Sequence, residues 1–142
     1  MTRPLLAVAL LAWLVLAAPA RADGLLIIAN RSVDVAAPMA LGEIAAIYLL
    51  RLTTWPDGGH IVPVNREATS RTRAEFTAQV LHEDNASLVT YWNEMHFMGK
   101  LPPVVQESES AMLLFVQRVP GAIGYISDAA SPSGVRVLAH VR

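Results

Sequence analysis

The chain has 142 residues, a formal net charge of −1 and no cysteine. A charge balance so close to neutral gives no electrostatic reason to expect binding to nucleic acid or to an anionic membrane surface. The lack of cysteine excludes disulfides and any zinc or redox site of the C-x-x-C type, so packing must stabilise the fold.

The first 22 residues have the organisation of a secretory signal peptide. Residues 1–3 form a short basic segment, residues 5–16 form an apolar run, and small residues lead up to Ala22. The apolar run is shorter than the roughly 20 residues that span a bilayer, which argues against a retained membrane anchor. We therefore expect cleavage after Ala22, no membrane insertion afterwards, and a periplasmic or secreted protein. Residues 23–142 suit one domain with one core.

The chain after Ala22 alternates segments typical of strands with segments typical of helices. Short apolar runs predict strands, and apolar residues recurring every three or four positions predict helices. The expected strands are residues 25–29, 60–65, 104–105, 122–126 and 135–141. The expected helices are residues 41–50, one carrying Phe76, Val80 and Leu81, one carrying Leu88, Val89, Trp92, Met95 and Phe97, and residues 107–119. Such alternation indicates a single three-layer α/β domain with a mixed central sheet.

Three residues in this pattern lead to predictions of their own. Pro63 lies inside the expected strand 60–65. Because proline has no backbone N–H, it indicates either an edge strand or the point where pairing ends. Trp55 opens a turn of sequence Pro-Asp-Gly-Gly, and Trp92 lies in an expected helix. Core packing or turn anchoring is the favoured interpretation for both tryptophans, with stacking on a ligand as the alternative.

The segment from Arg66 to Arg73 gathers charge and hydroxyl groups between an expected strand and an expected helix. A helix N-terminus has unpaired N–H groups and a partial positive charge, so it favours anions. Ser70 and Thr72 would add hydroxyl donors, and the planar guanidinium of Arg66 suits the oxygens of a phosphate group. A simpler interpretation is that Ser70 or Thr69 caps the helix and the arginines are solvated. From the residues alone, both interpretations stay open.

Five motifs, in order along the chain, resemble phosphate-binding proteins of ABC transporters, which belong to the type 2 periplasmic-binding-protein superfamily. The first two are Leu-Gly-Glu-Ile at residues 41–44 and Thr-Trp-Pro-Asp-Gly at residues 54–58. Ile-Val-Pro-Val-Asn-Arg-Glu at residues 61–67 and Ser-Arg-Thr-Arg at residues 70–73, followed by Phe76, are the next two. The fifth is Gly-Ala-Ile-Gly-Tyr at residues 121–125. The resemblance extends over residues 27–126.

The resemblance implies the fold of one lobe of such a protein and non-catalytic binding of a small oxyanion, with phosphate as the first candidate. In the family, the arginine, serine and threonine of the matching motif contact the anion, which implies Arg66, Ser70 and Thr72 as ligands, with Arg73 as a second charge. Arg71 stands where the family has glycine. The chain also has room for only one of the two lobes that close around the anion in the family.

The resemblance also implies partners. These are inorganic phosphate or a similar oxyanion, and an ABC permease or another envelope protein. No cofactor is implied. The alternative function is an extracytoplasmic protein-interaction or sensory module that has kept the fold and lost ligand binding.

The sequence has no motif of a known enzyme or metal centre. The four histidines (His60, His82, His96 and His140) form no i, i+4 pair on one helix, and no H-E-x-x-H motif occurs. The phosphate loop, the dinucleotide-binding glycine motif and the G-x-S-x-G turn of hydrolases are missing as well. We therefore expect a protein that is not an enzyme and carries no metal.

Overall fold

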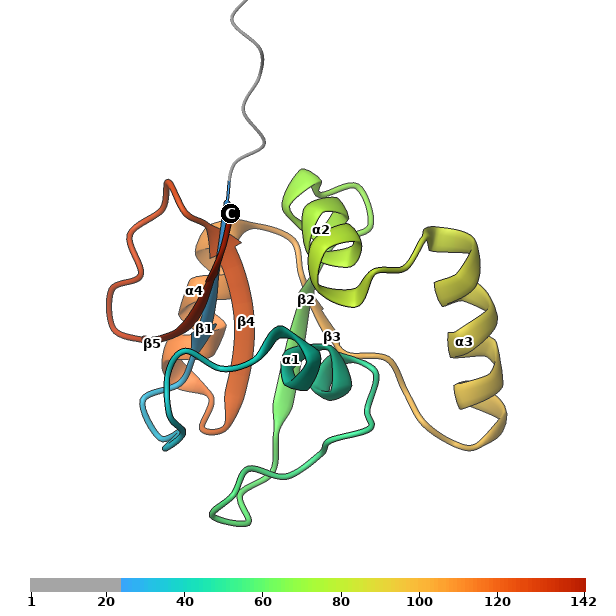
Figure 1. The fold of residues 1–142 in the computed structure, drawn as a ribbon, viewed down its shortest axis with the longest axis horizontal. Helices are drawn as coiled ribbons and strands as arrows, with labels where there is room; N and C mark the ends of the chain where they lie inside the picture. The colour runs from blue at the N-terminus through green and yellow to red at the C-terminus, as the bar shows by residue number, and fades with distance from the viewer. Residues whose placement is uncertain (1–23) are drawn as a thin grey trace, which may run out of the picture.

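The computed structural model describes residues 24–142, so the predicted signal peptide (residues 1–22) lies outside the described residues. A mixed five-stranded sheet forms the centre of the domain (Figure 1). The strands are β1 (Leu25–Ala29), β2 (Val62–Arg66), β3 (Val104–Gln106), β4 (Ala122–Ser127) and β5 (Arg136–Val141). The helices are α1 (Leu41–Tyr48), α2 (Arg71–Phe76), the π-helical segment η1 (Thr77–Leu81), α3 (Asn85–Phe97) and α4 (Glu109–Arg118). The predicted α/β class is confirmed.

The sheet has the strand order β3-β2-β4-β1-β5. β2 pairs in parallel with both β3 and β4, whereas β1 is antiparallel to β4 and β5. β2 is therefore an inner strand, and the edge-strand interpretation of Pro63 is wrong. Pro63 pairs with Ile123 of β4, and pairing with β3 starts only at Val64. The missing N–H of Pro63 is tolerated because it lies just before the β3 ladder begins, as the second interpretation predicted.

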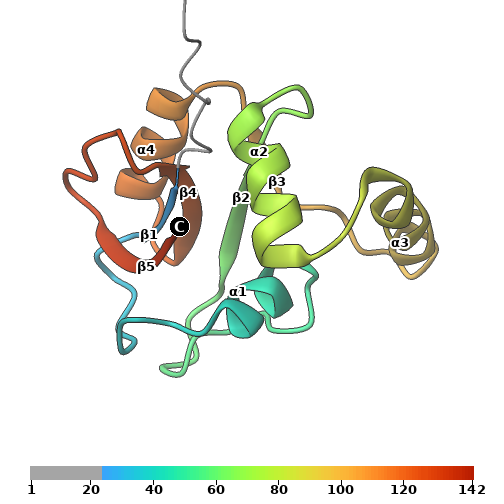
Figure 2. The ribbon, with the colours of Figure 1, turned by 45° about the horizontal axis from the view of Figure 1, so that its top comes forward.

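Different helices cover the two faces of the sheet, which gives three layers. α1, α2 and η1 pack on one face, and α4 packs on the other (Figures 1 and 2). Alternation along β1 directs Ile27 to the first face and Ile28 to the second, and both are fully buried. On the first face, Phe76 and Val80 fill the core as their spacing predicts; on the second, Met112 and Val116 of α4 do so.

The Gly-Ala-Ile-Gly-Tyr segment needs both of its glycines for packing. Gly121 has φ of +77°, and a Cβ there would lie 2.2 Å from the carbonyl oxygen of His60. The indole Nε1 of Trp55 donates to the Gly121 carbonyl at 3.0 Å, and Trp55 is buried, which confirms the turn-anchoring prediction. A Cβ on Gly124 would lie 2.5 Å from Sδ of Met112. The second glycine therefore lets α4 lie directly against β4.

Helix α3 packs differently from the other helices. It lies to one side of the domain, beyond β3, in both views (Figures 1 and 2). Met95 is its one buried residue, whereas Val89 and Phe97 are 61% and 91% exposed. Trp92 is half-buried and belongs to neither hydrophobic core cluster, so the core-packing prediction is wrong for it. The spacing of apolar residues predicted this helix correctly, but Val89 and Phe97 face solvent.

Candidate functional site

The residues implied as anion ligands come together where β2 ends and α2 begins. Arg66 is the last residue of β2, and Ser70 is the N-cap of α2, as one of the two alternatives for the cap predicted. The Oγ of Ser70 accepts a hydrogen bond from the backbone N–H of Arg73 at 3.2 Å. The Nη1 of Arg73 donates to the carbonyl oxygen of Arg66 at 2.8 Å. Thr72 lies in the same first turn of α2 and is half-buried. Two guanidinium groups and two hydroxyls therefore share one strand-to-helix junction.

Arg71 occupies the first position of α2 without backbone strain. It is not among the residues between 24 and 142 that have positive φ, so the glycine found here in the resembling family is not required by this backbone. Its side chain is 65% exposed, and Nε lies 3.4 Å from Oε1 of Glu75 one turn later. α2 continues directly into η1, so the helical run extends from residue 71 to residue 81.

Glu67 pairs with Arg66 across two parallel hydrogen bonds. Nε of Arg66 lies 2.9 Å from Oε2 of Glu67, and Nη2 lies 3.1 Å from Oε1. The Arg66 side chain is only 10% exposed, whereas the Glu67 side chain is 28% exposed. The hydrogen bonds from Arg66 lower the pKa of Glu67, so the carboxylate is charged at neutral pH. Glu67 thus occupies the pair of donors that a planar oxyanion edge would use.

The buried side chain of Tyr125 contacts the end of β2. The hydroxyl of Tyr125 accepts from the backbone N–H of Arg66 at 3.1 Å and donates to Oδ1 of Asn65. Burial raises the pKa of Tyr125 to about 12, so the hydroxyl stays protonated and keeps its donor role. The ring of Phe76 stacks on that of Tyr125 with centroids 4.1 Å apart. This contact fixes α2 relative to β2 and β4. Glu67 and Tyr125 both lie in the five motifs, but the sequence pattern predicts no role for either.

A groove of about 450 Å³ lies between α2 and α3, next to the junction of β2 and α2. Arg73 and Asn65 are among its polar lining residues, and Trp92 and Val105 are among its apolar ones. Arg73 therefore belongs both to the junction and to the groove. The half-buried position of Trp92 is explained by its place in the lining of this groove.

The structure bears on two further classes of function. Among the described residues, no three His, Asp or Glu side chains lie together as a metal site would require. None of the helices between residues 24 and 142 is long and apolar enough to cross a membrane.

Comparison with known proteins gives matches in structure alone. No protein-family model matches the chain, and no curated protein sequence matches it. Among solved structures, it is similar to a protein from Clostridium perfringens assigned as a phosphate ABC transporter substrate-binding protein and solved with bound phosphate (24% identity, TM-score 0.65). It is also similar to an ABC-type phosphate transport receptor from Vibrio cholerae (23% identity, TM-score 0.65) and to PstS from Borrelia burgdorferi (14% identity, TM-score 0.64).

These matches extend over most of this chain and less than half of the other proteins. Each covers 82% of this chain, but only 44%, 45% and 46% of the three proteins in the order given. At such identities the likeness establishes the fold. The chain is a single α/β domain with the architecture of one lobe of the periplasmic-binding-protein fold.

Proposed function

We propose that the protein binds a small oxyanion, with phosphate as the first candidate, and performs no chemistry on it. In this role it is a substrate-binding or accessory component linked to an ABC transporter. The observation that carries the proposal is the convergence of Arg66, Arg73 and the capped N-terminus of α2 at the carboxyl end of β2. Ligands of open α/β sheets bind outside the carboxyl ends of the strands.

Each group at the junction has a distinct part in the proposed binding. The Arg66 guanidinium offers two parallel N–H donors to two oxygens of the anion. The hydroxyl hydrogens of Ser70 and Thr72 are donors, and the N–H groups of the first turn of α2 add partial positive charge. Arg73 supplies a second full charge. Glu67 must give up its contact with Arg66 as the anion enters, which makes it a competitor for the site.

The structural neighbours add support because their names describe phosphate transport receptors and substrate-binding proteins. The proposal extends this role to a chain that aligns with less than half of those proteins. It also includes export: cleavage after Ala22 would release residues 23–142 outside the inner membrane, where such components work. An ABC permease or another envelope protein is the proposed protein partner.

Calorimetric titration of the purified protein with phosphate and sulfate tests the proposal. We expect saturable heat with phosphate that disappears in Arg66→Ala. Arg118→Ala is the matched control, since Arg118 is an exposed arginine at the end of α4, on the opposite face of the sheet. Because Arg66 is buried, its replacement can disturb the fold. Loss of heat therefore counts as loss of binding only when the circular dichroism spectrum of Arg66→Ala matches that of the wild type. The proposal is wrong if the wild-type protein gives no saturable heat at millimolar phosphate.

A further inference from the structure

Most of the large apolar side chains that the described residues expose gather around α3 and β3. Nine large apolar side chains are exposed between residues 24 and 142, and only Leu114 and Val137 lie elsewhere. The other seven are Leu52, Val89, Phe97, Met98, Leu101, Val104 and Val105. We call these seven residues the α3–β3 surface. Exposed apolar side chains concentrated in one part of a protein are typical of an interaction site.

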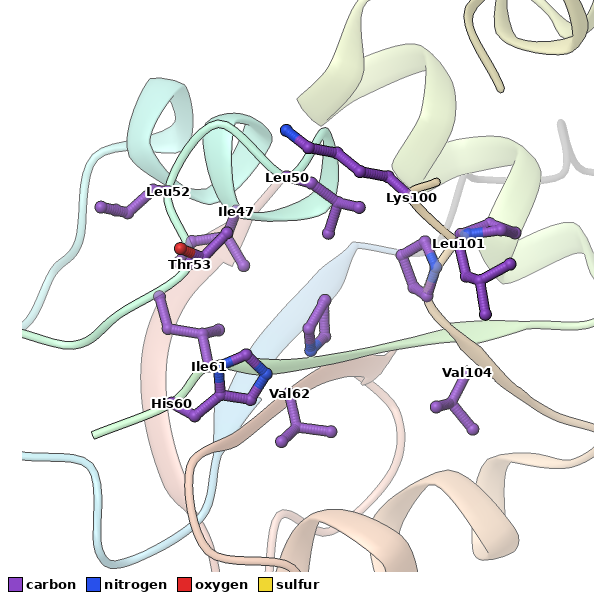
Figure 3. A pocket seen from close by; sticks show the side chains of 13 residues that line it. Ile47, Leu50, Leu52, Thr53, His60, Ile61, Val62, Lys100, Leu101 and Val104 are labelled. Carbon is purple, nitrogen blue, oxygen red and sulfur yellow. The ribbon is translucent and has the colours of Figure 1, made fainter. Parts of the chain in front are cut away.

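An apolar groove of about 350 Å³ opens within this surface (Figure 3). Side chains of α1 and the residues after it, of the chain around the start of β2, and of the segment leading into β3 converge on it; they include Ile47, Leu50, Ile61, Val62, Leu101 and Val104. Its polar lining consists of Thr53, His60 and Lys100, and no carboxylate lines it. The groove therefore accepts an apolar group, with a positive charge at its rim.

The most exposed apolar side chain of the surface lies close to the groove along the chain. Phe97 is the last residue of α3 and is 91% exposed, and Lys100, three residues later, lines the groove. A helix of 13 residues is marginally stable on its own, and α3 buries only Met95. A contact that covered Phe97 would stabilise α3 as well as remove a large apolar ring from water.

We propose that the α3–β3 surface joins two copies of this chain across a two-fold axis, with Phe97 of each copy seated in the apolar groove of the other. A two-fold interface requires one surface that carries both the projecting group and its receptor, and this surface carries both. Charge supports the same arrangement. Glu94 and Lys100 lie on either side of Phe97 in the sequence, both are exposed, and neither forms an ion pair within residues 24–142. A two-fold axis brings Glu94 of one copy to Lys100 of the other, twice.

The groove that receives Phe97 and the proposed anion site lie at opposite ends of β2. The strand begins at Val62 in the groove and ends at Arg66. Seating of Phe97 in that groove therefore does not cover Arg66, whereas Val89 and Val105 of the α3–β3 surface line the second groove, which contains Arg73. The proposed dimer does not require a bound anion.

Sedimentation velocity of the purified protein over the micromolar range tests the proposal. We expect a dimer for the wild type, and Phe97→Glu should weaken association at least about 100-fold, as replacement of central aromatic anchors does. Because Phe97 is almost fully exposed, the variant should keep the circular dichroism spectrum of the wild type. Leu114→Glu is the matched control, an exposed apolar residue on α4 outside the surface, and it should remain dimeric.

Charge reversal tests the two-fold geometry itself. Glu94→Lys and Lys100→Glu should each weaken the dimer several-fold, and the double variant should restore it. Phosphate affinity in Phe97→Glu should equal that of the wild type, which separates this proposal from the anion site. The proposal is overturned by a monomeric wild type, by a Phe97→Glu variant that dimerises like the wild type, or by single charge variants that the double variant does not rescue. A monomeric wild type would leave the surface to a different protein.

Discussion

Replacing Glu67 with glutamine should strengthen phosphate binding, because it removes the carboxylate that holds the Arg66 guanidinium. In the wild type, both parallel donors of Arg66 are taken at 2.9 and 3.1 Å. An incoming oxyanion must displace the carboxylate and also lies beside its negative charge. Glutamine has nearly the same shape, so the backbone of the junction should not change.

The size of the gain follows from the exposure of the pair. The Glu67 side chain is 28% exposed, so water screens its attraction to Arg66. Ion pairs of this kind change an equilibrium by roughly 1.4-fold to 5-fold. Removal of a negative charge next to the bound anion adds to this, so we expect phosphate affinity to rise about 3-fold to 10-fold.

Calorimetric titration with phosphate measures the gain directly. Glu75→Gln is the matched control, because Glu75 pairs with the exposed Arg71 at 3.4 Å and its replacement changes the net charge equally. We expect its affinity to change by less than about twofold. Unchanged or weaker phosphate binding in Glu67→Gln, in a protein with a wild-type spectrum, would refute the competition between Glu67 and the anion. An equal gain in both variants would assign the effect to net charge alone.

Two further predictions concern stability. In urea denaturation, Gly124→Ala should lower the free energy of unfolding by about 1–3 kcal/mol, because the new Cβ would lie 2.5 Å from Sδ of Met112. Gly42→Ala should instead raise the free energy of unfolding by about 0.4–1 kcal/mol, because no atom lies within 4 Å of its new Cβ. Because Arg66 lowers the pKa of Glu67, their pair stabilises the fold above the usual glutamate pKa of about 4.3, and this contribution is lost as the pH falls through the lowered pKa. The melting temperature should therefore fall less in acid for Glu67→Gln than for the wild type, and identical acid profiles would contradict the pairing.

The order of strands and helices could be predicted from the sequence because it depends on local periodicity. Apolar runs predicted the centres of all five strands. The spacing of Phe76 and Val80 predicted which face of the α2–η1 helical run enters the core. Sheet order depends on contacts between distant segments. Pro63 illustrates the difference: the residue signals a gap in pairing, but whether the gap lies at an edge or before an inner ladder is decided by where β3 begins.

The exposure of α3 could not be predicted for a related reason. Apolar residues at helical spacing indicate a face that is covered, but the pattern does not distinguish coverage by the same chain from coverage by another. Val89 and Phe97 satisfy the pattern and yet face solvent.

The strand-to-helix junction was predictable from the sequence, but its geometry was predictable only in part. Capping chemistry predicted Ser70 or Thr69 as the cap, and the structure has Ser70 there, with Arg66 at the end of the preceding strand. The pairing of Arg66 with Glu67 was not foreseen, because neighbouring residues of an extended strand face opposite sides. β2 ends at Arg66, and this break in the strand allows the two side chains to meet. The role of Tyr125 depends on the register between β2 and β4, which the sequence does not encode locally.

Backbone amide NMR of the ¹⁵N-labelled protein during a phosphate titration tests the central claim most directly. We predict saturable shifts concentrated in the amides of residues 66–73, at the end of β2 and the first turn of α2. The absence of saturable shifts up to millimolar phosphate, or shifts confined to residues away from this junction, would contradict the account.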